Sequence, residues 1–105
     1  MRKNNRQAGE VKATFNIDGS FKITGRGLVI YGDIVDGVIK RENFIFFNDG
    51  AKTTKLKIAS LDFVDRIGRD NISKVGLTFV YDDENQRKDL ETLKVAKQFA
   101  IITEQ

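Results

Sequence analysis

Apolar residues occupy alternate positions on both sides of the dipeptide Asp18-Gly19 near the start of the chain. The alternating positions are Ala13, Phe15, Ile17, Phe21 and Ile23. A period of two is typical of a β-strand with one buried face. Because Asp and Gly tolerate the positive φ angles of a two-residue hairpin loop, the pattern predicts two strands joined by a turn at Asp18-Gly19.

Two further turn signals follow the first. Asp36-Gly37 separates residues 28–35, which are mostly apolar, from residues 38–40, and Asn48-Asp49-Gly50 comes after the next apolar run. A tight turn at Asp36-Gly37 would pair the two runs that flank it. The segment from Thr24 to Lys40, TGRGLVIYGDIVDGVIK, is therefore expected to form the central hairpin of the fold.

The second half of the chain contains three more runs with β character. From Lys52 to Phe63 the apolar positions alternate but change phase near Ser60, which predicts a β-bulge that exchanges the inward face. Val75 to Tyr81 alternates regularly, and Gln98 to Thr103 is the expected closing strand. A bulged, curved strand favours a barrel over a flat sheet.

Between the last two strands, residues 82–97 are rich in charge. Leu90, Leu93 and Lys97 recur at helical spacing there, which predicts one short helix near residues 87–97.

The spacing of the turn signals indicates the fold class. The signals recur about every 10 to 15 residues, as in small barrels and sandwiches, and the chain contains no proline. We expect an all-β fold, a small antiparallel Greek-key β-barrel of about six to seven strands. Residues 10–105 should form this single domain, and residues 1–9 a flexible basic tail.

The run from Phe44 to Phe47 is unusual because it is apolar at every position. In a strand, such a run places large side chains on both faces. One face is core, and the other must be covered either by a loop or residues 82–97, or by a protein partner or second copy of the chain. Phe46 and Phe47 are therefore candidate binding residues.

Composition excludes most familiar catalytic sites. The 105 residues include no cysteine and no histidine, which removes thiolate chemistry, the usual near-neutral base and the commonest zinc ligands. We expect a protein that is not an enzyme and has no metal or cofactor. The charged start lacks the apolar stretch of a signal peptide, and no apolar run is long enough to span a bilayer, so we expect a cytoplasmic location.

The net charge of +3 has a local origin. Arg2, Lys3 and Arg6 account for it, and from Ala8 onward basic and acidic residues are equal in number. The tail is either a solvated terminus or an arm that contacts phosphates.

One basic face can be constructed beyond the tail. It comprises Lys52, Lys55 and Lys57, with Lys40 and Arg41 across a possible hairpin. Alternation places Lys55 and Lys57 on one side of their strand. This face is either solvated surface or a candidate RNA-binding site.

The segment from Phe21 to Arg41, FKITGRGLVIYGDIVDGVIKR, resembles the second domain of translational GTPases such as elongation factor Tu. The shared features are an aromatic residue, a Gly-Arg-Gly triplet, a strand near a second glycine, a turn closed by glycine and an Ile-Lys pair. Here they are Phe21, Gly25-Arg26-Gly27, Leu28 to Ile30, Gly32, Gly37 and Ile39-Lys40. The resemblance implies a small antiparallel barrel, which in several members contacts the acceptor end of tRNA or ribosomal RNA.

Two candidate residues come from this resemblance. Arg26 matches an arginine near the terminal nucleotide of tRNA, and Asp18 stands in the place of an acidic residue near the aminoacyl group. The chain has no GxxxxGK[ST] segment, so we expect no GTP binding by this chain.

Two functions follow as hypotheses. The first is a non-enzymatic interaction module that docks a protein partner or a second copy of itself. The second is an RNA- or ribosome-binding module related to translation factors.

Overall fold

The computed structural model describes residues 10–50, 52–64 and 74–105. The predicted basic tail, residues 1–9, lies outside these described residues. The described elements are β1 (Val11–Ile23), β2 (Gly27–Gly37), β3 (Phe44–Asp49), β4 (Lys52–Val64), β5 (Lys74–Phe79), α1 (Glu84–Glu91) and β6 (Gln98–Thr103).

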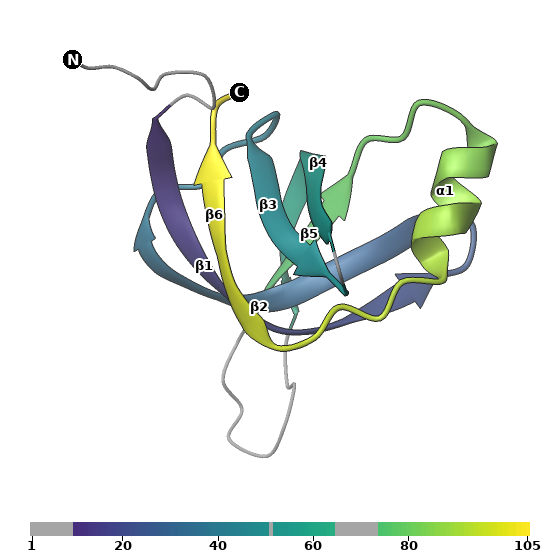
Figure 1. Cartoon of the computed structure of the whole chain (residues 1–105), viewed down its shortest axis with the longest axis horizontal. Helices are drawn as coiled ribbons and strands as arrows, with labels where there is room; N and C mark the ends of the chain where they lie inside the picture. Colours follow the sequence, from purple (N-terminus) through teal and green to yellow (C-terminus); the bar gives the residue numbers. More distant parts are fainter. Residues whose placement is uncertain (1–9, 51, 65–73) are drawn as a thin grey trace.

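The six described strands close into one antiparallel barrel in the order β1-β2-β5-β4-β3-β6. Four of these strands form a Greek key: β3, β4 and β5 are consecutive in the chain and adjacent in the sheet, and β2, which precedes them in the chain, lies beside β5. β6 lies between β1 and β3 and closes the barrel (Figure 1). The predicted fold class is confirmed, including the closing role of residues 98–103.

One hydrophobic core fills the barrel, and every strand contributes to it. Its most deeply buried side chains include Phe15, Ile30, Ile45, Ile58 and Leu77, each fully shielded from solvent. The alternation in the sequence therefore identifies the inward face of most strands correctly.

The predicted turn at Asp18-Gly19 is wrong, because β1 runs through it as one strand. The register with β2 shifts between Ile17 and Gly19, so Asp18 is the extra residue of a β-bulge. An extra residue reverses the faces of the strand beyond it. Phe21 and Ile23 consequently lie on the outer surface, 39% and 37% exposed, and not in the core.

The predicted central hairpin is also wrong in its position. The hairpin is formed by β1 and β2, and its turn is Thr24-Gly25-Arg26, closed by a hydrogen bond from Arg26 N–H to the Ile23 carbonyl (2.8 Å). β2 ends at Gly37, where φ is 86°, and the residues that follow do not pair with it. Asp and Gly favour positive φ in either setting, so the dipeptide marks the strand end without indicating a hairpin.

Two other predictions about β4 are confirmed. A hairpin turn follows Asp49, which pairs with Lys52. The register between β4 and β5 shifts between Ile58 and Ser60, so a bulge lies where the sequence changes phase.

The helix α1 begins and ends earlier than the predicted range of residues 87–97. Its N-cap is Asp83, whose carboxylate accepts a hydrogen bond from Gln86 N–H (2.8 Å), a strong start signal. The helix ends at Glu91 with Thr92 as its C-cap, and Leu90 and Val95 are buried in the core of the barrel. Among the residues that the structure describes, no helix has the length and apolar character needed to cross a membrane.

Candidate functional site

The outer surface of β4, β3 and β6 carries a cluster of apolar side chains that are not part of the core. In β3, Ile45 and Phe47 point into the barrel, 0% and 2% exposed, so Phe44 and Phe46 point outward. Phe47 is therefore a core residue and is not available to a partner in the folded barrel. Phe46 is half-buried on the outside.

Neighbouring strands extend this cluster. Phe46 pairs with Ile101 of β6 on one side and with Lys55 of β4 on the other. Phe99 and Ile101 share the outer side of β6 and are 71% and 42% exposed. We call the outward side chains of Phe44, Phe46, Phe99, Ile101, Lys55 and Lys57 the aromatic face.

The lysines of β4 form one edge of the aromatic face. The Lys55 ammonium lies 4.5 Å from the ring centroid of Phe44 and 5.4 Å from that of Phe46, a cation–π arrangement with two rings. Lys57 is exposed and pairs with Phe44 across the strands. Neither lysine has an ion-pair partner among the described residues.

The other predicted basic residues lie in three separate places. Lys52 lies at the β3–β4 hairpin end, three residues from Lys55 and on the opposite side of the strand. Arg41 donates a hydrogen bond from Nε to the Ala59 carbonyl (3.3 Å), so it adds a third cation along β4. Lys40 is separate from these residues and lines a hollow at another part of the barrel.

A hollow of about 220 Å³ borders the aromatic face at Phe44. Its other walls include Lys57, Val80, Asp82 and Gln86, which belong to β4 and to the segment at the start of α1. The segment expected as cover for the outer face of β3 thus stands beside Phe44 without closing over it.

Asp18, a candidate from the family resemblance, belongs to an ion-pair cluster. Its carboxylate lies 2.8 Å from Lys74 Nζ, which also contacts Asp33 at 2.9 Å. The hydrogen bonds to Asp18 and then Asp33 raise the pKa of Lys74 above its usual value. Lys97 approaches Asp18 at 4.0 Å. The cluster joins β1, β2 and β5, which is a structural role.

Arg26, the second candidate from the resemblance, is exposed in the β1–β2 turn. It lines a small hollow of about 70 Å³ with Phe21, Ile23, Val29 and Asp62. The apolar part of this hollow exists because the bulge at Asp18 turns Phe21 and Ile23 outward. No hydrogen bond or ion pair joins Arg26 to Asp18 among the described residues.

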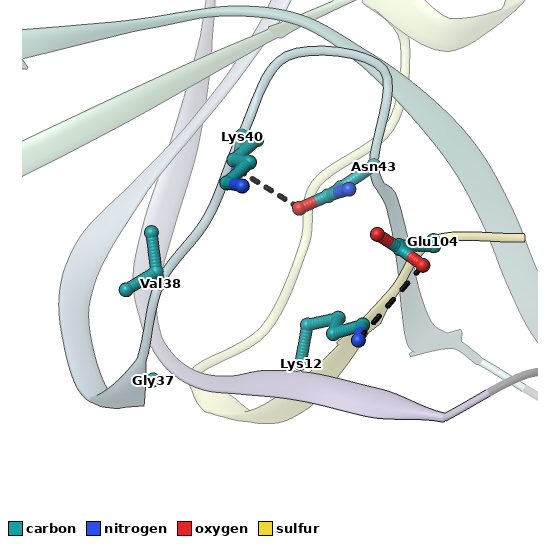
Figure 2. A pocket seen from close by; sticks show the side chains of 6 residues that line it. All are labelled: Lys12, Gly37, Val38, Lys40, Asn43 and Glu104. Atoms are coloured by element: carbon teal, nitrogen blue, oxygen red, sulfur yellow. Dashed lines mark hydrogen bonds and ion pairs between the residues drawn. The ribbon is translucent and has the colours of Figure 1, made fainter.

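A hollow of about 350 Å³ lies where β2 leaves the barrel wall (Figure 2). Figure 2 shows Lys12 directed toward Glu104, 3.8 Å apart, on one side of it. On the other side, the Asn43 carboxamide oxygen accepts a hydrogen bond from Lys40 N–H (2.8 Å). The hydrogen bond holds the β2–β3 connection, and the charges around the hollow are mixed, with Lys12 paired to Glu104.

Within the described part of the chain, no three His, Cys, Asp or Glu side chains come together in a way that would hold a metal ion.

The candidates predicted from the sequence did not include Phe99 and Ile101, the two most exposed apolar residues of the aromatic face. The signal was present, because Ala100 and Ile102 occupy the alternate positions of the same strand. The structure buries Ala100 and Ile102, 2% and 0% exposed. A strand that is apolar on both faces repeats the pattern noticed at Phe44 to Phe47.

No protein-family model, no curated protein and no solved structure matches the chain.

Proposed function

We propose that this barrel is a non-enzymatic binding module that docks a protein through the aromatic face. The observation that carries the proposal is the exposure of Phe99 and Ile101 beside Phe46, on strands whose inner faces already fill the core. Contiguous apolar side chains at the surface mark interaction sites, whereas single ones do not. Aromatic residues are also enriched in interfaces.

The form of this surface supports docking over catalysis. The aromatic face lies on regular strands whose positions are set by the barrel, and a hollow borders it at Phe44. The chain also has no histidine or cysteine to act as base or nucleophile. A rigid apolar surface with a basic edge suits recognition.

Capture from cell extract tests the proposal with a matched pair of variants. Phe99→Ser removes the most exposed ring of the aromatic face, and Val35→Ser changes an apolar residue of β2 that is 55% exposed on another part of the barrel. The tagged protein should retain a partner after nuclease treatment, Val35→Ser should retain it too, and Phe99→Ser should lose it. Identical capture by both variants would contradict the proposal.

RNA binding is a second candidate, supported by one specific observation. Lys55 and Lys57 form no ion pair within the described part of the chain and lie next to aromatic rings. Proteins that bind single-stranded nucleic acids use this combination for phosphate contacts and base stacking. On this alternative, affinity for RNA falls steeply with salt and falls further on Lys55→Ala. Loss of the captured partner on nuclease treatment would favour it over protein docking.

We also propose, on the residues quoted for the resemblance, that the chain is a stand-alone relative of the second domain of translational GTPases, working in the cytoplasm. The closed Greek-key barrel and the Gly-Arg-Gly turn support this relationship. Arg26 is exposed in that turn and available to a ligand, whereas Asp18 is engaged by Lys74.

A further inference from the structure

The aromatic face is asymmetric in charge. Its β4 edge carries Lys55 and Lys57, and its β6 edge carries Phe99 and Ile101. The outward residues between and beside them are neutral: Thr53, Phe44, Phe46, Asn48, Thr14 and Asn16. No outward residue is acidic between Thr53 and Lys57, between Phe44 and Asn48, or between Phe99 and Ile101. In β1 the carboxylate of Asp18 lies beyond Asn16, where it is engaged by Lys74. Asp82 lines the adjoining hollow, and it forms no ion pair with either lysine.

This charge distribution argues against a second copy of the chain as the occupant. A two-fold dimer places the same patch on both sides of the interface. Each basic edge would then meet the neutral side chains of β3 and β6 of the other copy, and the nearest carboxylate on the β1 side, that of Asp18, is already held by Lys74. Two lysines per copy would lose water without gaining a carboxylate, which is unfavourable.

The ring geometry argues against single-stranded RNA. Base stacking needs an open ring face. The Lys55 ammonium already lies over Phe44 and Phe46. On this face Phe99 is the remaining ring with high exposure, and its neighbour Ile101 is aliphatic. One open ring and two cations make a short and weak platform for a polynucleotide, whereas an apolar side chain of a protein packs on all of them.

We propose that the aromatic face binds an acidic amphipathic helix of a partner protein. This inference rests on the proposed docking function and adds the chemistry of the partner. Three neighbouring strands span about 10 Å, close to the diameter of one α-helix. A helix lying along β3 would set its apolar stripe on Phe46, Ile101 and Phe99. Carboxylates on one flank of that stripe would face Lys55 and Lys57.

Synthetic model helices test this chemistry directly. The probe is a fluorescent peptide of about 18 residues with a Leu and Phe stripe and Glu along one flank. Two matched peptides replace every flanking Glu by Gln or by Lys. Fluorescence anisotropy should show that the Glu peptide binds about tenfold more tightly than the Gln peptide, and that the Lys peptide binds more weakly still.

Charge reversal on the protein provides the complementary test. The double variant Lys55→Glu/Lys57→Glu should bind the Glu peptide about tenfold more weakly than the parent protein does, and the Lys peptide about tenfold more tightly. Lys52→Glu is the matched control, because Lys52 is exposed at the hairpin end on the opposite side of β4. It should change either affinity by less than about twofold, as expected for a rim charge outside the contact. Circular dichroism and urea unfolding establish that each variant is folded.

The outcomes separate this inference from the function on which it rests. Equal affinity for the Glu and Gln peptides, with no effect of Lys55→Glu/Lys57→Glu, would overturn the acidic partner. If Phe99→Ser still abolished binding in that case, docking through the aromatic face would stand. If Phe99→Ser changed nothing, docking would fail as well.

Two further results would overturn the acidic helix in favour of other occupants. Concentration-dependent dimerisation that Phe99→Ser removes, measured by light scattering, would identify a second copy of the chain. An oligouridine RNA that displaces the Glu peptide and binds more tightly than it does would identify a nucleic acid.

Discussion

Where the backbones of two strands come close together, a single position of this barrel can admit only glycine. Gly32 of β2 lies opposite Ile17, beside the bulge of β1. A Cβ at Gly32 would lie 1.9 Å from the Asn16 carbonyl oxygen. The sequence places Gly32 within a run of β character, but the atom that requires a glycine there belongs to a different strand. Only the packed barrel identifies that atom.

Gly32→Ala should therefore destabilise the protein by about 3 kcal/mol or more, because the backbone of β1 must shift to admit the methyl group. Gly25→Ala is the control. Gly25 has a φ of 82° but open space around it, so alanine there meets strain without a clash and should cost about 1 kcal/mol. Urea unfolding measures both, and equal losses would contradict the close approach at Gly32.

Tyr81 shows how one side chain links distant segments. Its hydroxyl oxygen accepts a hydrogen bond from Leu28 N–H (2.9 Å), and its ring covers Gly27, where a Cβ would lie 2.3 Å from that oxygen. Burial raises the pKa of Tyr81 above its usual value. The folded state therefore holds this proton more tightly than the unfolded state does.

This pKa difference predicts a loss of stability in alkali. Above about pH 10 the unfolded chain releases the tyrosine proton more readily, so the free energy of unfolding falls as the pH rises. Tyr81→Phe should cost about 1 kcal/mol at neutral pH through the lost acceptor, and should lose less stability than the parent between about pH 8 and pH 11.

Urea unfolding of both proteins at the two pH values measures this difference. Lys74, whose pKa is also raised, loses its contribution in the same direction as the pH rises. It is present in both proteins, so the difference between them reports Tyr81. If the free energy of unfolding fell equally in both proteins, the burial of Tyr81 would not account for the loss of stability in alkali.

At the scale of elements, strand identity was predictable and strand connection was not. β4, β5 and β6 lie where alternation placed them, and the phase change near Ser60 is a bulge. At Asp18 the same alternation gave the wrong prediction of a turn, because a β-bulge and a turn can have the same sequence signal. A turn brings the flanking residues together, whereas a bulge continues the strand toward a different partner. Only the pairing with β2 distinguishes the two.

The two faces of β3 predict opposite responses to truncation. Phe47→Ala should cost about 3–5 kcal/mol, because Phe47 lies in the core and its removal leaves a cavity. Phe46→Ala should cost about 1 kcal/mol or less, because that ring is on the outside under Lys55. Thermal or urea unfolding measures both. Equal losses would show that Phe46 is covered within the monomer and is not part of a docking surface.

At the scale of the whole molecule, barrel closure depends on pairing between the two ends of the chain. β1 pairs with β6, and Val11 lies opposite Thr103. Such non-local pairing must overcome the entropy of closing a loop that spans almost the whole chain. The fold therefore has the topology of slowly folding proteins.

Refolding from urea should accordingly take about milliseconds to seconds. It should contain no phase on the scale of tens of seconds from proline isomerisation, because the chain has no proline. Stopped-flow tyrosine fluorescence, with and without a prolyl isomerase, measures this. A slow phase accelerated by the isomerase would contradict the expectation.

The sequence by itself determined the class of fold, the single core and the inward faces of most strands, because these follow from local alternation and turn chemistry. It also indicated that Lys55 and Lys57 share one side of β4 and that β3 is apolar on both faces. Tertiary structure decided which strands are neighbours, and therefore that Phe46 lies between Lys55 and Ile101. It also placed Phe47 in the core and Asp18 against Lys74. These contacts join residues far apart in the chain, and no local pattern encodes them.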